Sequence, residues 1–361
     1  MKVPIVALLG RKDEPTDALE EYCRYLGAAL RRHDIHLEIR RVPWEPCGWP
    51  KASLDLQLEA TKWREAWVLL QYTALSWSLR GFSLKVLRIL KILKSAGARV
   101  AIVYHDVEPF PGSRPIDRLR RSIQLCTMRR ALSLSDLALF TVPLNKVSWL
   151  TRPVSHAHFV PVGPNLPILE MSSGARPALE LPTIGVFTIT GGTAGSRETK
   201  IILGAVRYAA EHLGKLRLLV FGRHAEIRED EIRNGLRYSS VETSVEGILR
   251  PDQVVERLQA CDLLLFIRGP ISSRRSSALA GIACGLPTIA FEGPETAPPI
   301  TDAGVVLVAE NKPDELNAAL VHVLSDDLYR AELAARSRLA YQAYFSWPAI
   351  AAQIATLLDT H

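Results

Sequence analysis

Hydroxyl and guanidinium side chains gather after a short apolar strand late in the chain. The segment reads IRGPISSRRSSALAGIACG, where a strand is expected to end near Ile267 and a Gly-Pro turn follows. The side chains suited to phosphate binding come next: Ser272, Ser273, Arg274, Arg275, Ser276 and Ser277. Ser276 or Ser277 can N-cap the helix of small residues that follows, and both arginines can reach a phosphate. The alternative is a surface loop with a capped helix and solvated arginines.

A second candidate anion site follows another expected strand, in TITGGTAGSRETKII. Its candidate residues are Gly191, Gly192, Arg197 and Lys200, placed in a glycine-containing loop that opens a helix over about 198–212. Backbone N–H groups at such a start can cradle phosphate, although the spacing matches neither GxGxxG nor the P-loop. A flexible loop with an exposed Lys/Arg pair is the alternative. Arg223, after the strand LRLLVFG, suits contact with a base or phosphate, or with solvent alone.

Three polar side chains end a strand in the first half of the chain, in VYHDVEPF: His105, Asp106 and Glu108. A strand end capped by these residues, with a hydrogen-bonded histidine, is the structural interpretation. The other histidines, including His156 and His158, show no metal-ligand pattern, so no metal is expected. The five cysteines lie far apart without a CxxC pair, which argues against zinc or disulfides and favours a reducing compartment.

Strands and helices must position these side chains, and they alternate along all 361 residues. Apolar strand segments such as VPIVALL, WVLLQ and PTIGVFTIT are each followed by a helical pattern. This alternation predicts an α/β fold with parallel sheets covered by helices, with ligands at the carboxyl ends of the strands. We expect an N-terminal Rossmann-like domain over 1–165, a proline-rich linker over 166–182, a C-terminal Rossmann-like domain over 183–343, and a final helix over 344–361.

Several of these segments resemble the GT-B glycosyltransferases, specifically the family-four retaining enzymes. The resemblance is carried by GILRPDQVVERLQACDLLLF and SALAGIACGLPTIAF, with LLQYTALSWSLRGFSL, HFVPVGPNLP and YFSWPAIAAQIATLL in matching order. It implies a GT-B fold, two Rossmann-like domains facing each other across a cleft, with the last helix crossing back onto the first domain. It covers nearly the whole chain.

The resemblance implies roles for the candidate residues. The second domain would bind a nucleotide-sugar donor, with Arg197 and Lys200 neutralising its diphosphate, and no metal would be needed. His105 would bind a sugar hydroxyl, and Asp106 or Glu108 would act as general base only if the enzyme inverts. The family usually carries two glutamates eight positions apart, and their places here hold Ser272 and Ala280. That departure implies either a divergent donor mode or lost activity.

Positive charge is concentrated in the first half of the chain. The net charge is +6, yet residues 79–152 hold fourteen Lys/Arg against four Asp/Glu, or +10. Within LKVLRILKILK the cations recur every third residue (Lys85, Arg88, Lys91 and Lys94), and five of seven tryptophans, including Trp77, precede it. This pattern favours either an amphipathic helix on an anionic membrane or an acceptor groove, or else the outer face of an ordinary Rossmann helix.

We therefore expect a cytoplasmic enzyme, peripheral on the inner face of the membrane, without a signal peptide or membrane span. It would transfer a sugar from a nucleotide-sugar to a saccharide or lipid-linked acceptor, with retention, in bacterial surface polysaccharide or glycoconjugate assembly. No cofactor and no nucleic-acid partner is expected. A non-catalytic GT-B-like partner subunit and a sugar-nucleotide epimerase are the alternatives.

Overall fold

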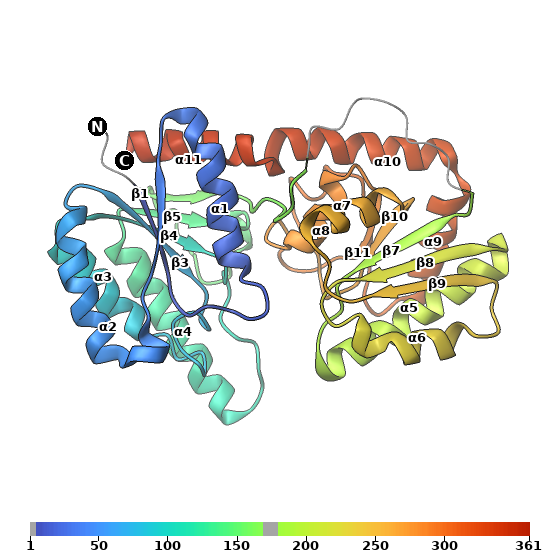
Figure 1. The fold of residues 1–361 in the computed structure, drawn as a ribbon, viewed down its shortest axis with the longest axis horizontal. Coiled ribbons are helices and arrows are strands. Elements are labelled where there is room, and N and C mark those ends of the chain that lie inside the picture. Colours follow the sequence, from blue (N-terminus) through green and yellow to red (C-terminus); the bar gives the residue numbers. More distant parts are fainter. Residues whose placement is uncertain (1–4, 169–179) are drawn as a thin grey trace. The chain divides into compact units, whose positions relative to one another are not determined.

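The computed structural model describes residues 5–168 and 180–361. The chain divides into two compact units (Figure 1): Met1–Val162 with Trp347–His361, and Gly163–Ser346. Most of the predicted linker, over 166–182, falls at residues 169–179, outside the described residues.

Unit 1 is a parallel sheet in the strand order β2-β1-β3-β4-β5-β6, the six strands found among the described residues. Its elements are β1 (Ile5–Leu9), α1 (Ala18–Leu30), β2 (Leu37–Arg41), α2 (Trp44–Ala60), β3 (Trp67–Tyr72), α3 (Lys85–Ser95), β4 (Arg99–Tyr104), α4 (Pro115–Leu134), β5 (Leu137–Phe140), β6 (Ala157–Phe159) and α11 (Trp347–Thr360). Strands β1 and β3 are buried along their whole length because helices cover both faces.

Unit 2 repeats this architecture with the order β12-β11-β10-β7-β8-β9, again six parallel strands among the described residues. Its elements are β7 (Thr183–Phe187), α5 (Gly192–Leu213), β8 (Leu216–Phe221), α6 (Glu229–Leu236), β9 (Val241–Glu246), α7 (Pro251–Gln259), β10 (Leu263–Phe266), α8 (Ser276–Ala283), β11 (Thr288–Phe291), β12 (Val305–Val308), α9 (Pro313–Ser325) and α10 (Asp327–Ala340). Helices α5 and α6 lie on one face and α7 and α8 on the other (Figure 1).

Strand order reverses once in each sheet. In unit 1 the first strand, β1, lies between β2 and β3; in unit 2 the first strand, β7, lies between β8 and β10. The loops that leave such neighbouring strands diverge to opposite faces, which opens a crevice at their carboxyl ends. These two switch points are where the sheets can receive a ligand.

Helix α11 belongs to unit 1. Trp347 packs edge-on against Tyr22 at 5.3 Å and stacks on Tyr25 at 5.7 Å, both on α1. The Trp67 indole N–H donates to the Leu358 carbonyl at 3.1 Å. The helix begins at Trp347, after a short π-helical stretch, rather than at the predicted residue 344.

The tryptophan-rich segment is core, so its predicted place at an acceptor or membrane surface is wrong. Trp77 is fully buried, and its indole N–H donates to the Gln71 carbonyl at 2.9 Å. Trp44 is also buried and stacks on Trp49 at 5.1 Å. An indole whose N–H has a backbone partner is stable in a core, which is why these large rings lie inside.

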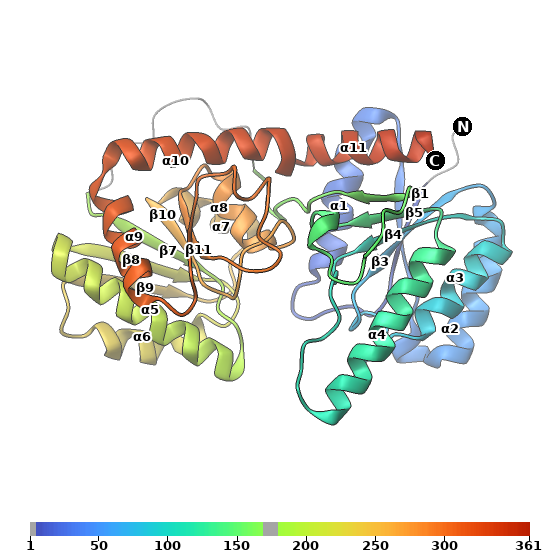
Figure 2. The same cartoon turned by 180° about the vertical axis from the view of Figure 1, so that it is seen from behind.

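The apolar flank of α3 is equally unavailable to a membrane. Val86, Ile89, Leu90, Ile92 and Leu93 are buried in the core of unit 1, and α3 packs beside α4 (Figure 2). The cations of the opposite flank are exposed, and Lys94 pairs with Asp136 at 2.7 Å. The apolar flank of α3 thus packs as in an ordinary Rossmann helix, and the cations remain on its surface. No helix in the described ranges has both the length and the hydropathy of a membrane span.

Candidate functional site

The loop after β7 turns directly into α5. The helix has Gly191 as its N-cap and begins at Gly192, which has φ 67°, earlier than the predicted start at Glu198. Gly195 allows this tight turn, because a Cβ there would lie 1.9 Å from the Thr190 carbonyl oxygen. The expectation that Arg197 and Lys200 stand in a loop is therefore wrong; both are helical.

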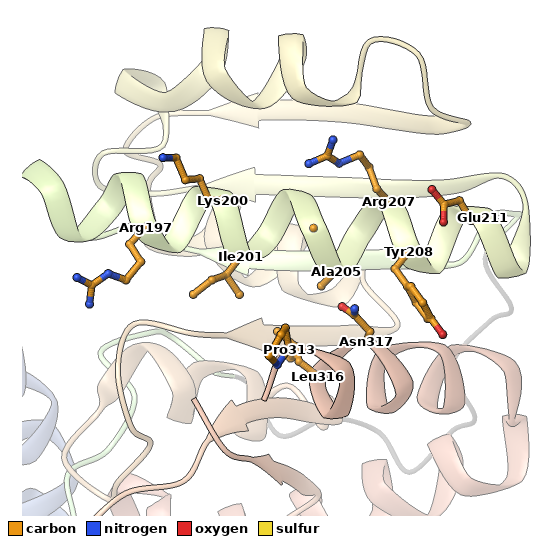
Figure 3. Close-up of a pocket in the computed structure, with 11 residues that line it drawn as sticks. Arg197, Lys200, Ile201, Ala205, Arg207, Tyr208, Glu211, Pro313, Leu316 and Asn317 are labelled. Carbon is orange, nitrogen blue, oxygen red and sulfur yellow. The ribbon is translucent and has the colours of Figure 1, made fainter. Parts of the chain in front are cut away.

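Arg197 and Lys200 are exposed and line a surface groove of about 520 Å³ between α5 and α9. Ile201, Leu316 and Pro313 contribute its apolar surface. Figure 3 shows the two cationic side chains pointing to different sides of α5. The structure therefore does not bring them together over one phosphate, and their donor-binding role stays a prediction.

A cluster of which the sequence indicated only Arg223 lies at the switch point of unit 2. Arg268, two residues beyond β10, donates hydrogen bonds to the hydroxyl oxygens of Thr188 and, at 3.5 Å, Thr190. These threonines follow β7, so Arg268 bridges the loops of two neighbouring strands. The Thr190 N–H donates to the Glu198 carboxylate at 2.8 Å. We call Thr188, Thr190, Glu198, Arg223 and Arg268 the strand-end cluster.

Electrostatics in the strand-end cluster favour an anion. Burial lowers the pKa of Arg268; the charge of Glu198 raises it and the charge of Arg223 lowers it again. A guanidinium remains protonated at neutral pH all the same. The Arg223 carbonyl accepts the Ile189 N–H at 3.1 Å, which keeps the loop after β8 against the loop after β7. Two arginines and one carboxylate thus meet near the uncapped start of α5.

The predicted phosphate loop after β10 contains an ion pair. Arg274 donates to both oxygens of Glu295, at 2.7 and 2.9 Å. Burial raises the pKa of Glu295, but the hydrogen bonds and charge of Arg274, with Ser272 and Arg275, hold it below its ordinary value. Ser272 and Ser273 are each 1% exposed. Glu295 therefore fixes Arg274, and its place after the next strand, β11, hid it from the sequence pattern.

Helix α8 does not have the predicted serine cap. Its N-cap is Arg275, because the Arg275 carbonyl accepts the Ala278 and Leu279 N–H groups at 2.9 and 3.0 Å. Ser276 and Ser277 are already helical, and no side chain caps the helix. Ala280 is 1% exposed, packed on the buried face of α8. The first turn of α8 therefore presents backbone N–H groups and half-buried serines.

The residues after β4 in unit 1 are built into local hydrogen bonds. The Gln71 amide nitrogen donates to the Leu69 carbonyl, so its oxygen faces His105 and accepts from Nε2 at 2.8 Å. The Tyr22 ring meets the imidazole edge-on at 4.9 Å. Asp106 accepts the Ala74 N–H at 2.8 Å, and Glu108 accepts the Ser148 hydroxyl at 2.6 Å. This geometry orients the imidazole and gives both carboxylates a loop-holding role.

Metal binding finds no support in the geometry of the described chain. Across residues 5–168 and 180–361, His, Cys, Asp and Glu nowhere form a group of three or more that could hold an ion. The switch point of unit 2 presents guanidinium, hydroxyl and backbone N–H donors. Such donors bind anionic oxygens.

Searches for similar proteins place the chain by structure. No protein-family model matches the sequence, and no curated protein does either. Sucrose-phosphate synthase from Thermosynechococcus elongatus is similar over 99% of both chains, with a TM-score of 0.72 and 18% identity. HepE from Anabaena, in complex with UDP and glucose, has a TM-score of 0.65 and 15% identity over 99% of this chain and 100% of that one. WaaG, a glycosyltransferase involved in lipopolysaccharide biosynthesis, has a TM-score of 0.64 and 18% identity, again over 99% of this chain and 100% of that one.

These likenesses settle the fold. Two units with parallel six-stranded sheets, described over residues 5–168 and 180–361, match GT-B structures over almost their whole length. The chain has the GT-B fold, as the sequence predicted. At 15–18% identity the likeness defines the architecture and leaves the activity to be argued from the site.

Proposed function

We propose that the protein is a glycosyltransferase that moves a sugar from a nucleotide-sugar donor to a saccharide or lipid-linked acceptor. The observation that carries the proposal is the cationic switch point of unit 2, where Arg268 and Arg223 meet the start of α5. A nucleoside diphosphate supplies the anion that such a site takes. Solved structures with the same fold support it, since HepE is described in complexes with UDP and with UDP-glucose.

The proposed reaction proceeds with retention and needs no metal. The bond from the anomeric carbon to the diphosphate oxygen breaks as the bond to the acceptor oxygen forms. The acceptor proton passes to the leaving diphosphate, whose negative charge the arginines and helix N–H groups stabilise. His105 would position a sugar hydroxyl, which its Gln71 and Tyr22 contacts orient. Bacterial surface polysaccharide or glycoconjugate assembly is the proposed setting.

Peripheral contact with an anionic membrane is part of the proposal and rests on exposed side chains of unit 1. Lys85, Arg88 and Lys91 are exposed on α3. On α4, Ile116 and Leu119 are 47% and 53% exposed on either side of Arg118. Cations beside apolar side chains suit a surface of anionic lipid. The fraction of protein that sediments with anionic vesicles should fall as the salt concentration rises. Vesicle binding that depends on neither lipid charge nor salt would contradict the proposed membrane contact.

A non-catalytic nucleotide-binding subunit is the second candidate. It is favoured by Ala280, which is buried in α8 where the resemblance expects a carboxylate. It is also favoured by Glu295, whose two oxygens are both taken by Arg274. Such a subunit would bind the nucleotide and transfer no sugar.

The test combines binding with turnover. Thermal shift against nucleoside diphosphates and nucleotide sugars should find a stabilising ligand, and Arg275→Ala or Lys200→Ala should weaken its binding. Mass spectrometry with that nucleotide sugar and candidate acceptors should then detect a glycosylated product. Stabilisation without product, and without hydrolysis of the donor, would favour the non-catalytic subunit. If no nucleotide raises the melting temperature of the folded protein, the proposed donor site is contradicted.

A further inference from the structure

Arg268 differs in its partners from four other half-buried arginines of this protein. Arg41, Arg120, Arg274 and Arg330 each pair with a carboxylate. Arg268 donates hydrogen bonds to the Thr188 and Thr190 hydroxyls, and among the described residues no carboxylate forms an ion pair with it, although the charge of Glu198 acts on it. A guanidinium has five N–H donors, and neutral hydroxyls offset little of the cost of burying its charge. Its site is therefore short of negative charge.

The side of Arg268 that lacks negative charge lies near the start of α5. Both threonines stand in the loop between β7 and the helix start, so their hydroxyls hold the guanidinium at this loop. The N-cap of α5 is Gly191, which offers no side chain to the first N–H groups of a 22-residue helix. A long helix with an uncapped start favours an anion there. Cation and helix start converge at the crevice between β7 and β10.

We infer that Arg268 binds the diphosphate of the donor, between the loops after β7 and β10. This assignment rests on the proposed function, which supplies the nucleotide-sugar. The diphosphate would lie against the guanidinium and the start of α5, with Arg223 on the side of β8. Thr188 and Thr190 position Arg268, and Glu198 positions the loop by accepting the Thr190 N–H.

The experiment measures binding of UDP, uridine and inorganic diphosphate by calorimetry to wild type, Arg268→Gln, Arg268→Lys and Arg217→Gln. Arg217 is the matched control: it is a half-buried arginine of the same sheet, paired with Glu242 at the amino end of β8. Removing one charge-assisted contact to phosphate should weaken UDP about 10- to 100-fold in Arg268→Gln. Arg217→Gln should bind like wild type, and Arg268→Lys should recover part of the loss.

A purely structural Arg268 predicts a different pattern. If it only braced the loops, Arg268→Gln would weaken uridine and UDP by the same factor, and this result would overturn the inference. Equal UDP affinity in Arg268→Gln and Arg217→Gln would overturn it too. Should Arg268→Gln fail to fold, the ratio of UDP to uridine affinity in Arg268→Lys decides in the same way.

Failure of the proposed function has its own signature. Wild type would then bind inorganic diphosphate, in a manner sensitive to Arg268→Gln, but no nucleoside diphosphate or nucleotide sugar. That outcome would support Arg268 as an anion-binding residue and would contradict a nucleotide-sugar as the donor. Binding of none of these anions by wild type would overturn both.

Discussion

The two switch points share a topology and differ in charge balance. In unit 1, Arg41 donates to the Gly10 carbonyl at 2.9 Å and to Asp17 and Glu20 at 2.9 and 3.0 Å. The loop after β1 packs closely on the segment after β3, because a Cβ on Gly10 would lie 2.2 Å from the Ser76 carbonyl oxygen. In unit 2, Arg268 follows β10, the counterpart of β3 rather than of β2, and its side chain donates hydrogen bonds to the Thr188 and Thr190 hydroxyls.

This difference shows what a repeated architecture leaves free. The same parallel sheet provides a crevice in each unit, but side chains decide whether protein or ligand neutralises the arginine. In unit 1, the carboxylates of Asp17 and Glu20 neutralise Arg41, so this switch point holds the protein together. We call Gly10, Asp17, Glu20 and Arg41 the joint of unit 1. Unit 2 leaves Arg268 without such a partner, so its switch point is suited to an anionic ligand.

The largest expected effect comes from breaking the joint of unit 1. Asp17 caps α1 by accepting the Leu19 and Glu20 N–H groups at 3.1 Å, and it also pairs with Arg41. Asp17→Ala should lower the free energy of unfolding by about 2–4 kcal/mol, because a cap and a partly buried ion pair are lost together. Urea denaturation checks this against Asp252→Ala, an exposed aspartate. A loss equal to that of the control would contradict the joint.

Two glycine substitutions separate the switch points by function. Gly10→Ala and Gly195→Ala each place a Cβ against a carbonyl oxygen, at 2.2 and 1.9 Å, so each should cost about 1–3 kcal/mol. Only Gly195→Ala should also weaken UDP, because it displaces the Thr190 loop that holds Arg268. Calorimetry and denaturation on both variants check this. Equal weakening of UDP by Gly10→Ala would contradict the assignment to unit 2.

Glu295→Gln should give a smaller, pH-dependent effect. The pKa of Glu295 is held below its ordinary 4.5, so its ionised form stabilises the folded state. Wild type should exceed the variant by about 2 kcal/mol at neutral pH, and this gap should shrink as the pH falls below 4.5 toward the folded pKa. Thermal melts of both proteins across pH 3–7, roughly the range over which a carboxyl titrates, measure this difference in stability. A gap that widens on acidification would contradict the ion pair with Arg274.

The sequence predicted the fold well because buried parallel strands have a strong signature. Segments such as WVLLQ and CDLLLF are apolar throughout, and the structure places β3 and β10 there. The amphipathic pattern of α3 predicted less, since a helix packed on a sheet and a helix lying on a membrane have the same periodicity. Only the neighbours of Val86 and Ile89 decide between them, and they are core residues.

The candidate site was harder to predict because its partners come from different loops. Arg268 meets threonines some 80 positions earlier, and Glu295 meets an arginine 21 positions earlier. Neither spacing forms a motif; both follow from β10 lying between β7 and β11. An arginine two residues beyond an apolar strand, at the edge where parallel sheets bind ligands, is the signal that could have indicated Arg268. The role of His105 stays a prediction from its strand end, and its hydrogen-bond partner Gln71 was not predicted.

Hydrogen–deuterium exchange with and without UDP tests the central claim most directly. Slower exchange is predicted in the loop and first turn over 188–195 and in the loop over 267–276, where the strand-end cluster and the start of α8 would meet the diphosphate. The joint around Gly10 and Arg41 is predicted to be unaffected. Unchanged exchange over 188–195 under saturating UDP, or protection confined to the joint of unit 1, would contradict the account.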